Sequence, residues 1–170
     1  MSDHKKELEK IVGTGNIKDD EQTLSAYMKD NSLVPARKPD MVLLVKTVEQ
    51  VQQVLRFANE TKTPVVPYSS GKNMHGATIA DQGGIIMDMS GMNNIIALNE
   101  EDWYVVIEPG VTYAQLQDFL NEKGYSLMVP FGIHPERSVL TSYLERDPVM
   151  AAPSFEHGNY LIMDTEVVLP

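Results

Sequence analysis

Residues 39–76 read PDMVLLVKTVEQVQQVLRFANETKTPVVPYSSGKNMHG, and this stretch decides the fold. Met41–Val45 is a short, continuous apolar run, which predicts a strand buried on both faces. Apolar side chains then recur at helical spacing, at Val48, Val51, Leu55 and Ala58. The run Pro64–Pro67 predicts a second strand. A strand, an amphipathic helix and a strand in roughly thirty residues predict a right-handed βαβ crossover.

The second predicted strand runs directly into a polar loop, Ser69–Gly76. In open α/β sheets, ligands bind at the carboxyl ends of strands. Glycines let backbone N–H groups approach an anion closely, Ser69 and Ser70 add hydroxyl donors, and Asn73 adds an amide. Lys72 can offset part of a diphosphate charge as a point cation. The loop therefore suits an anion, although a simple turn accounts for the same composition.

Neither common nucleotide-binding fingerprint is present. The sequence contains no G-x-G-x-x-G that opens a helix and no G-x-x-x-x-G-K-[ST]. This argues against a Rossmann-type dinucleotide fold and against a P-loop NTPase.

The N-terminal part of the chain predicts two helices. His4–Ile11 has a helical pattern that Gly13 and Gly15 interrupt. A second, short helix places Leu24, Tyr27 and Met28 on one face and ends before Pro35. Thr47 and Gln50 have the spacing of a capping box, which predicts that the helix of the βαβ crossover begins after Thr47.

Beyond the loop, the pattern predicts further strands and one more helix. Ile85–Met89 is a strand, and Ile95–Leu98 with Tyr104–Ile107 form a hairpin. Thr112 and Gln115 form a second box pattern, before a helix for which Gly124 suits the C′ position. Four prolines make the region 129–158 largely irregular, apart from a turn of helix near Val139–Glu145. Leu161–Leu169 is expected to be a final strand.

Composition sets limits on function. A formal charge of −10 over 170 residues argues against a nucleic-acid surface, because phosphate binding needs clustered Lys and Arg. The lack of cysteine excludes disulfides and thiolate chemistry and fits a reducing compartment. No signal peptide or membrane-length apolar run is visible, so we expect a cytoplasmic protein. The spacing of His75, His134 and His157 matches no metal-ligand motif, so no metal is expected.

Three motifs occur in one order: the stretch quoted above, then GGIIMDMSGMNNI, then VVIEPGVTYAQLQDFLNEKG. Together they resemble the FAD-binding domain of the vanillyl-alcohol-oxidase family, from about Pro35 onward. Members of that family oxidise hydroxy acids such as glycolate and lactate, or phenols such as 4-cresol and vanillyl alcohol. The resemblance implies an α+β fold of two small subdomains, the first containing the βαβ unit and the second mainly antiparallel. The expected segments are a helical one at 1–34 and subdomains at 35–98 and 99–170.

The resemblance also implies where FAD binds. The loop after the second strand wraps the FAD pyrophosphate, which assigns Ser69, Ser70, Gly71, Lys72, Asn73, Met74 and His75. The EPGV turn lies against the cofactor, which adds Pro109, Gly110 and Val111. The later match, SVLTSYLER and onward to EVVL, adds Ser138, Thr141, Ser142, Gly158 and Val168. That later stretch is more similar to the phenol-oxidising branch of the family than to the glycolate-oxidase branch.

Two departures from the family pattern affect the chemistry. Many members attach FAD covalently through a histidine in the pyrophosphate loop, but Lys72 stands at that position and His75 follows three residues later. We therefore expect non-covalent FAD. Asn159 stands where phenol-oxidising members carry an acidic residue near the flavin, so no catalytic acid is assigned. Arg137 and Arg146 are expected to pair with nearby Glu136, Glu145 or Asp147 rather than with phosphate.

In the family, substrate binds between the FAD domain and a cap domain that follows in sequence. The resemblance thus implies the FAD-binding portion of an oxidoreductase that acts on CH–OH groups, truncated at its C-terminus and inactive without a cap. The partners implied are FAD, a small hydroxy acid or phenol, and self-association or a cap-domain chain through the edge of the last strand. Two alternatives stay open: a non-catalytic nucleotide-binding or assembly module, and an unrelated α/β protein whose loop binds a simple anion.

Overall fold

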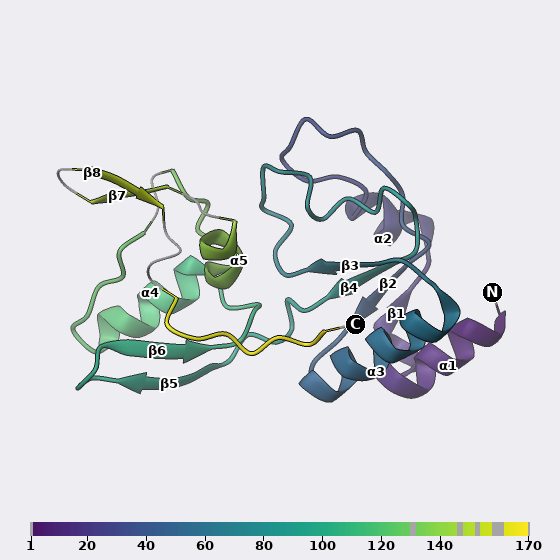
Figure 1. Ribbon diagram of the computed structural model, residues 1–170, viewed down its shortest axis with the longest axis horizontal. Helices are drawn as coiled ribbons and strands as arrows, with labels where there is room; N and C mark the ends of the chain where they lie inside the picture. The colour runs from purple at the N-terminus through teal and green to yellow at the C-terminus, as the bar shows by residue number, and fades with distance from the viewer. Residues whose placement is uncertain (1, 130–131, 146–147, 152–153, 158–161, 170) are drawn as a thin grey trace. The chain divides into compact units, whose positions relative to one another are not determined.

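The computed structural model describes residues 2–129, 132–145, 148–151, 154–157 and 162–169. The chain divides into two compact units, Met1–Gly91 with Val167–Pro170, and Met92–Glu166. Both combine helices with small sheets, as Figure 1 shows, so the predicted α+β class is confirmed. The finer division at residues 34 and 98 stays a prediction.

The first unit contains a four-stranded sheet of order β1-β2-β4-β3. Its strands are β1 (Ile17–Lys18), β2 (Met41–Leu44), β3 (Val65–Tyr68) and β4 (Ile85–Asp88). β1 is antiparallel to β2, whereas β2 and β3 both run parallel to β4. The helix α3 (Val48–Thr61) connects β2 to β3, as the pattern predicts. However, β4 lies between the two strands, so the crossover spans one intervening strand.

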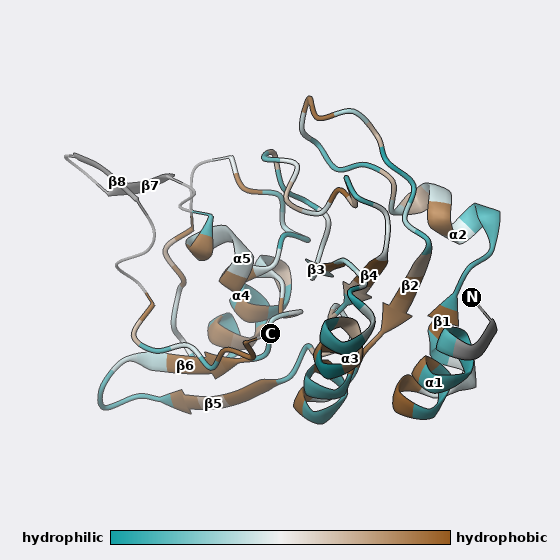
Figure 2. Cartoon of the chain, turned by 45° about the vertical axis from the view of Figure 1, so that its right-hand side comes forward, coloured by the Kyte–Doolittle hydropathy of each residue, from teal (hydrophilic) through white to brown (hydrophobic). Residues whose placement is uncertain are grey.

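Alternation along the strands divides the apolar side chains of the first unit between two faces of the sheet. Val42 and Ile86 pair in register and pack on one face with Leu24 and Ala80. The neighbouring residues Leu43 and Ile85 are also fully buried. Figure 2 shows β2 and β4 as predominantly hydrophobic and α3 with a hydrophilic side. Burial on both faces explains the continuous apolar run of β2.

The helices of the first unit are α1 (Ser2–Val12), the 3₁₀ turn η1 (Thr14–Asn16), α2 (Glu21–Ala26) and α3. α2 begins at the N-cap Asp20, whose carboxylate accepts the Thr23 N–H, and ends earlier than predicted. Tyr27 is its C-cap, so Tyr27 and Met28 lie outside the helix. At the start of α3, the predicted capping box is only half formed. Thr47 accepts the Gln50 N–H, but the Gln50 side chain accepts the Lys46 N–H.

The second unit contains the predicted hairpin, β5 (Ile95–Asn99) antiparallel to β6 (Tyr104–Ile107). α4 (Tyr113–Glu122) begins with a complete capping box between Thr112 and Gln115, and Gly124 follows with a φ of 80°. Both features confirm the sequence pattern. A second short helix, α5 (Val139–Leu144), is also confirmed. The core of this unit consists of Val111, Tyr113, Leu116, Leu120, Val139 and Tyr143.

Two predictions for the C-terminal region were wrong. The proline-containing region holds an antiparallel hairpin, β7 (Pro148–Ala151) with β8 (Ser154–His157), where irregular chain was expected. The final strand expected at Leu161–Leu169 is absent from its described residues, 162–169. A strand needs a neighbour for its N–H and C=O groups, and 162–169 pair with none of the described strands. In the described ranges, none of the helices has the length and apolarity to span a membrane.

Candidate functional site

The three parallel strands of the first unit end at one edge of the sheet. Leu44, Tyr68 and Asp88 are neighbours in register, because Asp88 pairs with both of the others. The polar loop Ser69–Gly76 leaves β3 at this edge, which is the place where open α/β sheets bind ligands. The predicted position of the loop is therefore confirmed, while its contact with a cofactor stays a prediction.

Gly71 is required by the conformation of this loop. Its φ is +61°, and a Cβ added there would lie 2.2 Å from the hydroxyl oxygen of Tyr68. The Tyr68 ring, which ends β3, thus lies directly against the Gly71 backbone. Any side chain at this position would collide with the ring and strain the backbone.

The other residues of the loop differ in exposure. Ser69 and Asn73 are buried, whereas Met74 and His75 are exposed, and Ser70 and Lys72 lie between these extremes. The Asn73 side chain turns into the protein, where its amide donates to Thr78 Oγ1 at 3.2 Å and its carbonyl accepts the His75 N–H at 3.1 Å. Asn73 therefore shapes the loop, which the sequence did not indicate.

The loop 69–76 lacks carboxylates, whereas the fold beside it contains two. No acidic residue occurs in 69–76, although the chain has 24. Two buried carboxylates lie nearby in the fold, and each accepts two donors. Asp88 accepts the Tyr27 hydroxyl at 2.6 Å and the Ser90 N–H at 2.7 Å. Asp30 accepts the Ser32 N–H at 2.8 Å and, more weakly, the Thr78 hydroxyl at 3.4 Å. Within the loop 69–76, which has no carboxylate, Lys72 is the only lysine or arginine.

Two tyrosines pack together at this edge. The rings of Tyr27 and Tyr68 pack with centroids 4.8 Å apart. Burial and then the hydrogen bond to Asp88 raise the pKa of Tyr27 well above its ordinary value. Burial and then the charge of Asp88 also raise the pKa of Tyr68. Both hydroxyls are protonated at neutral pH, as tyrosine hydroxyls ordinarily are, and that of Tyr27 donates to Asp88.

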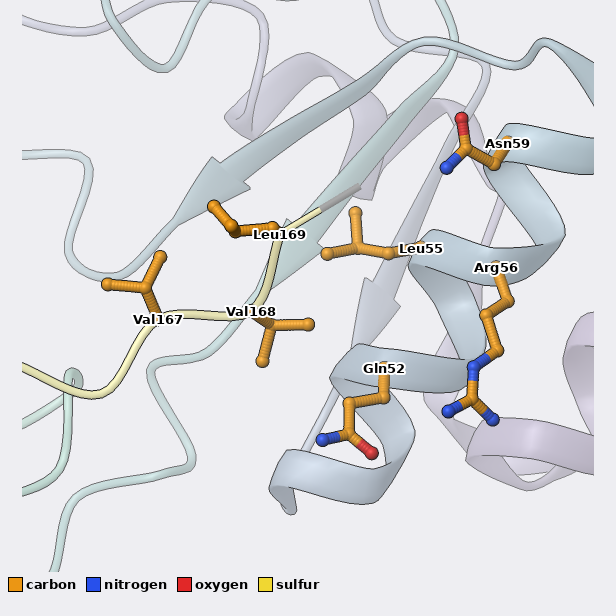
Figure 3. A pocket seen from close by; sticks show the side chains of 7 residues that line it. All are labelled: Gln52, Leu55, Arg56, Asn59, Val167, Val168 and Leu169. Atoms are coloured by element: carbon orange, nitrogen blue, oxygen red, sulfur yellow. The ribbon is translucent and has the colours of Figure 1, made fainter.

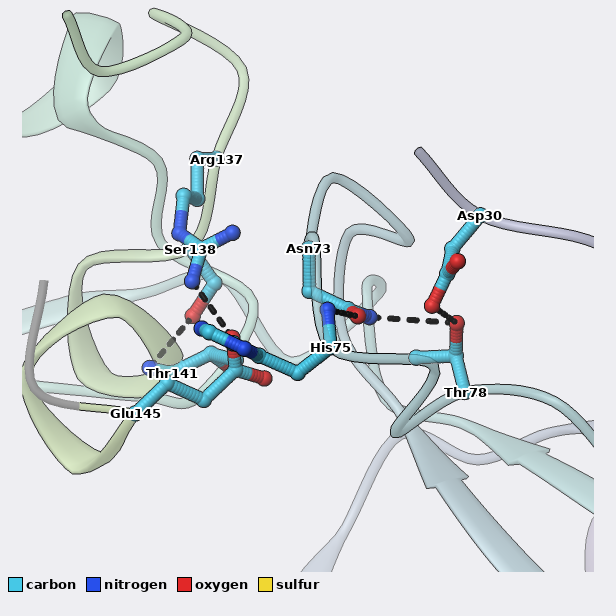
Figure 4. A network of polar contacts seen from close by, with 8 residues as sticks. All are labelled: Asp30, Asn73, His75, Thr78, Arg137, Ser138, Thr141 and Glu145. Atoms are coloured by element: carbon cyan, nitrogen blue, oxygen red, sulfur yellow. Dashed lines mark hydrogen bonds and ion pairs between the residues drawn. The ribbon is translucent and has the colours of Figure 1, made fainter. Parts of the chain in front are cut away.

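In the second unit, the structure brings two predicted cofactor segments together. The turn 108–111 and the start of α5 are joined by the Val139 N–H, which donates to the Val111 carbonyl at 3.0 Å, and by a bridge between Thr112 and Ser138. The Ser138 hydroxyl donates to the Pro109 carbonyl at 2.7 Å and accepts the Thr141 N–H at 3.3 Å. Figure 4 shows Ser138 and Thr141 of this unit, together with Asp30, Asn73 and Thr78 of the first unit.

Several predicted side chains of the second unit are buried within it. Val111 is part of the core, and Ser138 and Ser142 are fully buried. Gly110 is buried too, and its N–H donates to the Met92 carbonyl at 2.7 Å. Pro109 and Thr141 are partly exposed. The predicted pairing of Arg137 is confirmed, because it bonds Glu145 at 2.5 Å in a buried ion pair.

Val168 lies elsewhere in the first unit. With Val167 and Leu169 it lines a pocket of about 280 Å³ whose other wall is α3, as Figure 3 shows. The helix side chains there are Gln52, Leu55, Arg56 and Asn59. Gly158 lies outside the described residues. Among the described residues, no group of three or more His, Asp and Glu side chains could hold a metal ion.

Sequence reasoning missed Tyr27, Asp30, Thr78 and Asp88. For Asp88 there was a signal, since an acidic residue ends the otherwise apolar strand Ile85–Asp88. A buried carboxylate needs donors. The donor Tyr27 lies 61 residues away in sequence, so no local pattern could identify it.

Comparison with known proteins agrees with this geometry. Residues 39–143, more than half of the chain, match the family described as FAD binding domain. The chain is 36% identical over 125 residues to a D-2-hydroxyglutarate dehydrogenase of Stutzerimonas stutzeri, covering 74% of this chain and 27% of the relative. It is 34% identical over 125 residues to the 4-cresol dehydrogenase [hydroxylating] flavoprotein subunit of Pseudomonas putida, covering 71% and 24%.

Solved structures show the same relation. A 4-ethylphenol oxidase from Gulosibacter chungangensis, in an isoeugenol complex, superposes with a TM-score of 0.77 at 25% identity, over 87% of this chain and 29% of that chain. A p-cresol methylhydroxylase with substrate bound gives 0.69 at 32% identity, over 77% and 26%. The chain thus spans about a quarter of the length of these relatives. The family match over residues 39–143 shows that the chain belongs to the FAD binding domain family.

Proposed function

We propose that this chain is the FAD-binding portion of an FAD-dependent oxidoreductase, and that the loop Ser69–Gly76 holds the FAD diphosphate. One observation carries the proposal. The loop leaves a parallel strand at the carboxyl edge of the sheet, contains no carboxylate, and has a lysine beside a glycine whose φ of +61° disfavours a side chain. A diphosphate fits this donor set of backbone N–H groups, two serine hydroxyls and one ammonium group.

The bound flavin supplies the redox chemistry, and the protein binds and orients it. In this proposal Ser69, Ser70 and Lys72 contact phosphate oxygens. Lys72 is the one lysine or arginine of the loop, and Arg137 of the second unit is engaged by Glu145 in a buried ion pair. The turn Pro109–Val111 and the α5 residues contribute mainly through their backbone, because Ser138 and Ser142 are buried.

The finer features are also proposals. FAD is non-covalent, since Lys72 stands where family members carry the attaching histidine. The substrate is a hydroxy acid or a phenol, because the similar proteins include both D-2-hydroxyglutarate and 4-cresol dehydrogenases. Its site is completed by a cap domain, or by a partner chain. A cytoplasmic location is proposed too, although one relative is named as a mitochondrial D-lactate dehydrogenase.

Flavin titration of the purified 170-residue chain tests the proposal. We expect saturable one-to-one binding of FAD, much weaker binding of FMN, which lacks the diphosphate, and competition by ADP. Acid precipitation should release the flavin intact. The variant Lys72→Gln should bind FAD several-fold more weakly, roughly what one solvent-screened ionic contact contributes, with a flatter dependence on salt.

Two controls give the titration its meaning. Lys62→Gln removes the same single positive charge as Lys72→Gln, but at the end of α3. It should bind FAD like the wild type. FAD bound to the chain should be reduced by dithionite but not by D-2-hydroxyglutarate or 4-cresol in the absence of a cap. Colourless protein that refuses FAD would contradict the proposal and favour a non-catalytic assembly module.

A further inference from the structure

A segment that precedes the matched family region packs on the cofactor loop. The family match begins at residue 39, but residues 27–34 contact the loop and the strand ends at several points. The Tyr27 hydroxyl reaches Asp88, and the Asn31 N–H donates to the Asn73 carbonyl at 3.1 Å. A Cβ added to Gly76 would lie 2.4 Å from Val34 Cγ2, so the segment lies directly against the end of the loop. We call residues 27–34 the strap.

A buried chain of polar groups, shown in Figure 4, also links the strap to the loop. The Asn73 amide donates to Thr78 Oγ1 at 3.2 Å, and the Thr78 hydroxyl donates to Asp30 Oδ2 at 3.4 Å. The exposed fractions of Asn73, Thr78 and Asp30 are only 1%, 8% and 9%. The direction of this chain is fixed, because an amide N–H₂ only donates and a carboxylate only accepts.

This chain controls the shape of the loop. With its amide bound to Thr78, the Asn73 carbonyl oxygen accepts the His75 N–H and closes the turn 73–75. Rotation of the Asn73 side chain would break both bonds at a buried position, which is costly. Asp30 therefore acts on the loop through Thr78 and Asn73.

The strap has its own internal order. The Ser32 N–H donates to Asp30 Oδ1 at 2.8 Å, and the Val34 N–H donates to Ser32 Oγ at 3.1 Å. The Arg37 N–H donates to the Met28 carbonyl at 2.8 Å and closes the segment on itself. Leu33, in contrast, is fully exposed at the tip. The strap is thus a turn that its own hydrogen bonds hold together.

We propose that the strap is part of the cofactor site, and that Asp30 and Thr78 are positioning residues that hold residues 69–76 in the conformation that receives the diphosphate. This inference rests on the proposed function of the loop. It goes beyond the family match, which starts after the strap. Preorganisation of this kind strengthens binding because the cost of ordering the loop is met before the ligand arrives.

Substitutions of Thr78 test the inference in the full chain. Thr78→Val keeps the shape but removes the hydroxyl, which leaves the Asn73 amide and Asp30 without it. We expect FAD affinity to fall about tenfold. Thr78→Ser retains the hydroxyl and should bind FAD within about twofold of the wild type. Thr14→Val, which removes the hydroxyl of an exposed threonine outside the strap and the loop, should bind FAD like the wild type.

A second readout needs no cofactor. Lys72 is a trypsin site within the loop, so cleavage after Lys72 in the flavin-free chain reports how firmly the loop is held. Thr78→Val should be cut several-fold faster than the wild type and Thr78→Ser should not, while circular dichroism shows both folded. If Thr78→Val does not fold, Asp30→Asn replaces it. That variant leaves one acceptor oxygen for the Ser32 N–H and the Thr78 hydroxyl, so one of these two bonds is lost and cleavage should speed in the same way.

The outcomes separate the two proposals. If the wild type refuses FAD, the proposed function fails, and the cleavage rates alone decide whether the strap holds the loop. If the wild type binds FAD, a Thr78→Val variant with the same FAD affinity and the same cleavage rate as the wild type would overturn the proposed role of the strap. Equal losses in Thr78→Val and Thr78→Ser would also overturn it, because the retained hydroxyl would then have no effect.

Discussion

The two units hold their predicted cofactor segments by different means. In the first unit, side chains from distant parts of the sequence bond to one another beside the loop Ser69–Gly76, and Asn73 of the loop bonds to one of them, Thr78. Tyr27 bonds Asp88 across 61 residues, and Asp30 bonds Thr78 across 48. In the second unit, main-chain hydrogen bonds dominate, such as those of the Gly110 and Val139 N–H groups. Side chains add to them, since Ser138 binds the Pro109 carbonyl and Glu108 accepts two N–H donors of Asn94.

This difference predicts how each segment tolerates substitution. A backbone hydrogen bond survives most changes of side chain, whereas a side-chain contact is lost with the residue that makes it. The loop of the first unit should therefore be sensitive at many positions, including some outside the family match. The segments of the second unit should be sensitive at fewer positions, chiefly at Ser138 and Glu108.

The largest effect should come from Gly71→Ala. The added Cβ meets the Tyr68 hydroxyl oxygen at 2.2 Å, and the φ of +61° is strained for any residue with a side chain. Together these should cost roughly 3 kcal/mol in the conformation of the loop. We expect FAD affinity to fall about a hundredfold in a fluorescence titration.

Gly15→Ala is the matched control for that substitution. A Cβ at Gly15 would meet nothing within 4 Å, and its φ lies outside the left-handed region. This variant should bind FAD like the wild type. Wild-type affinity in Gly71→Ala would show that the loop does not need its present shape, and the comparison between the units would fail.

A smaller effect is expected from Ser138→Ala in the second unit. The Ser138 hydroxyl caps α5 through the Thr141 N–H and also binds the Pro109 carbonyl, at a fully buried position. Loss of both bonds should lower the free energy of unfolding by about 1–2 kcal/mol, measured by urea denaturation. FAD affinity should change by less than it does in Gly71→Ala, because main-chain bonds still hold the turn. Ser126→Ala, at an exposed position, should leave stability unchanged. A larger loss of FAD affinity than in Gly71→Ala would reverse the proposed contrast.

The sequence predicted those parts of the fold that local patterns encode. The apolar run of β2, the periodicity of α3, the hairpin β5–β6 and the box of Thr112 with Gln115 were confirmed, because each depends on residues close in sequence. The insertion of β4 between β2 and β3 was not predicted, since strand order depends on which apolar faces meet in space. The end of α2 was misplaced for a similar reason. Tyr27 has suitable helical spacing, but it is the C-cap of α2, and its hydroxyl bonds to Asp88, which is distant in sequence.

The same division applies to the candidate site. The position of the loop after β3 could be predicted, because ligand loops follow strand ends. The inward rotation of Asn73 could not, because its partners Thr78 and Asp30 are known only once the strap is in place. The expected strand at Leu161–Leu169 had suitable composition, but a strand requires a paired neighbour, and composition does not supply one.

The smallest predicted effect concerns pH and compares the tyrosines of the two units. Burial and the bond to Asp88 raise the pKa of Tyr27, and burial raises that of Tyr143, whose hydroxyl donates to the Met128 carbonyl. A raised pKa favours the folded state fully below the unfolded pKa, about 10, and this contribution is lost as the pH rises through the folded-state pKa. Tyr27→Phe should be less stable than the wild type by roughly 1 kcal/mol at neutral pH, for one bond from a half-buried hydroxyl to a carboxylate. That gap should narrow above about pH 10, because the wild type alone loses the Tyr27 contribution.

Tyr143→Phe should show a similar but weaker trend, since no carboxylate faces its hydroxyl among its described hydrogen bonds. Urea denaturation at several pH values measures both gaps, with Tyr104→Phe, at an exposed position of β6, as the control. A gap for Tyr27→Phe that widens with rising pH would mean that its hydroxyl does not act as the donor to Asp88, and that the first unit does not rely on this side-chain contact.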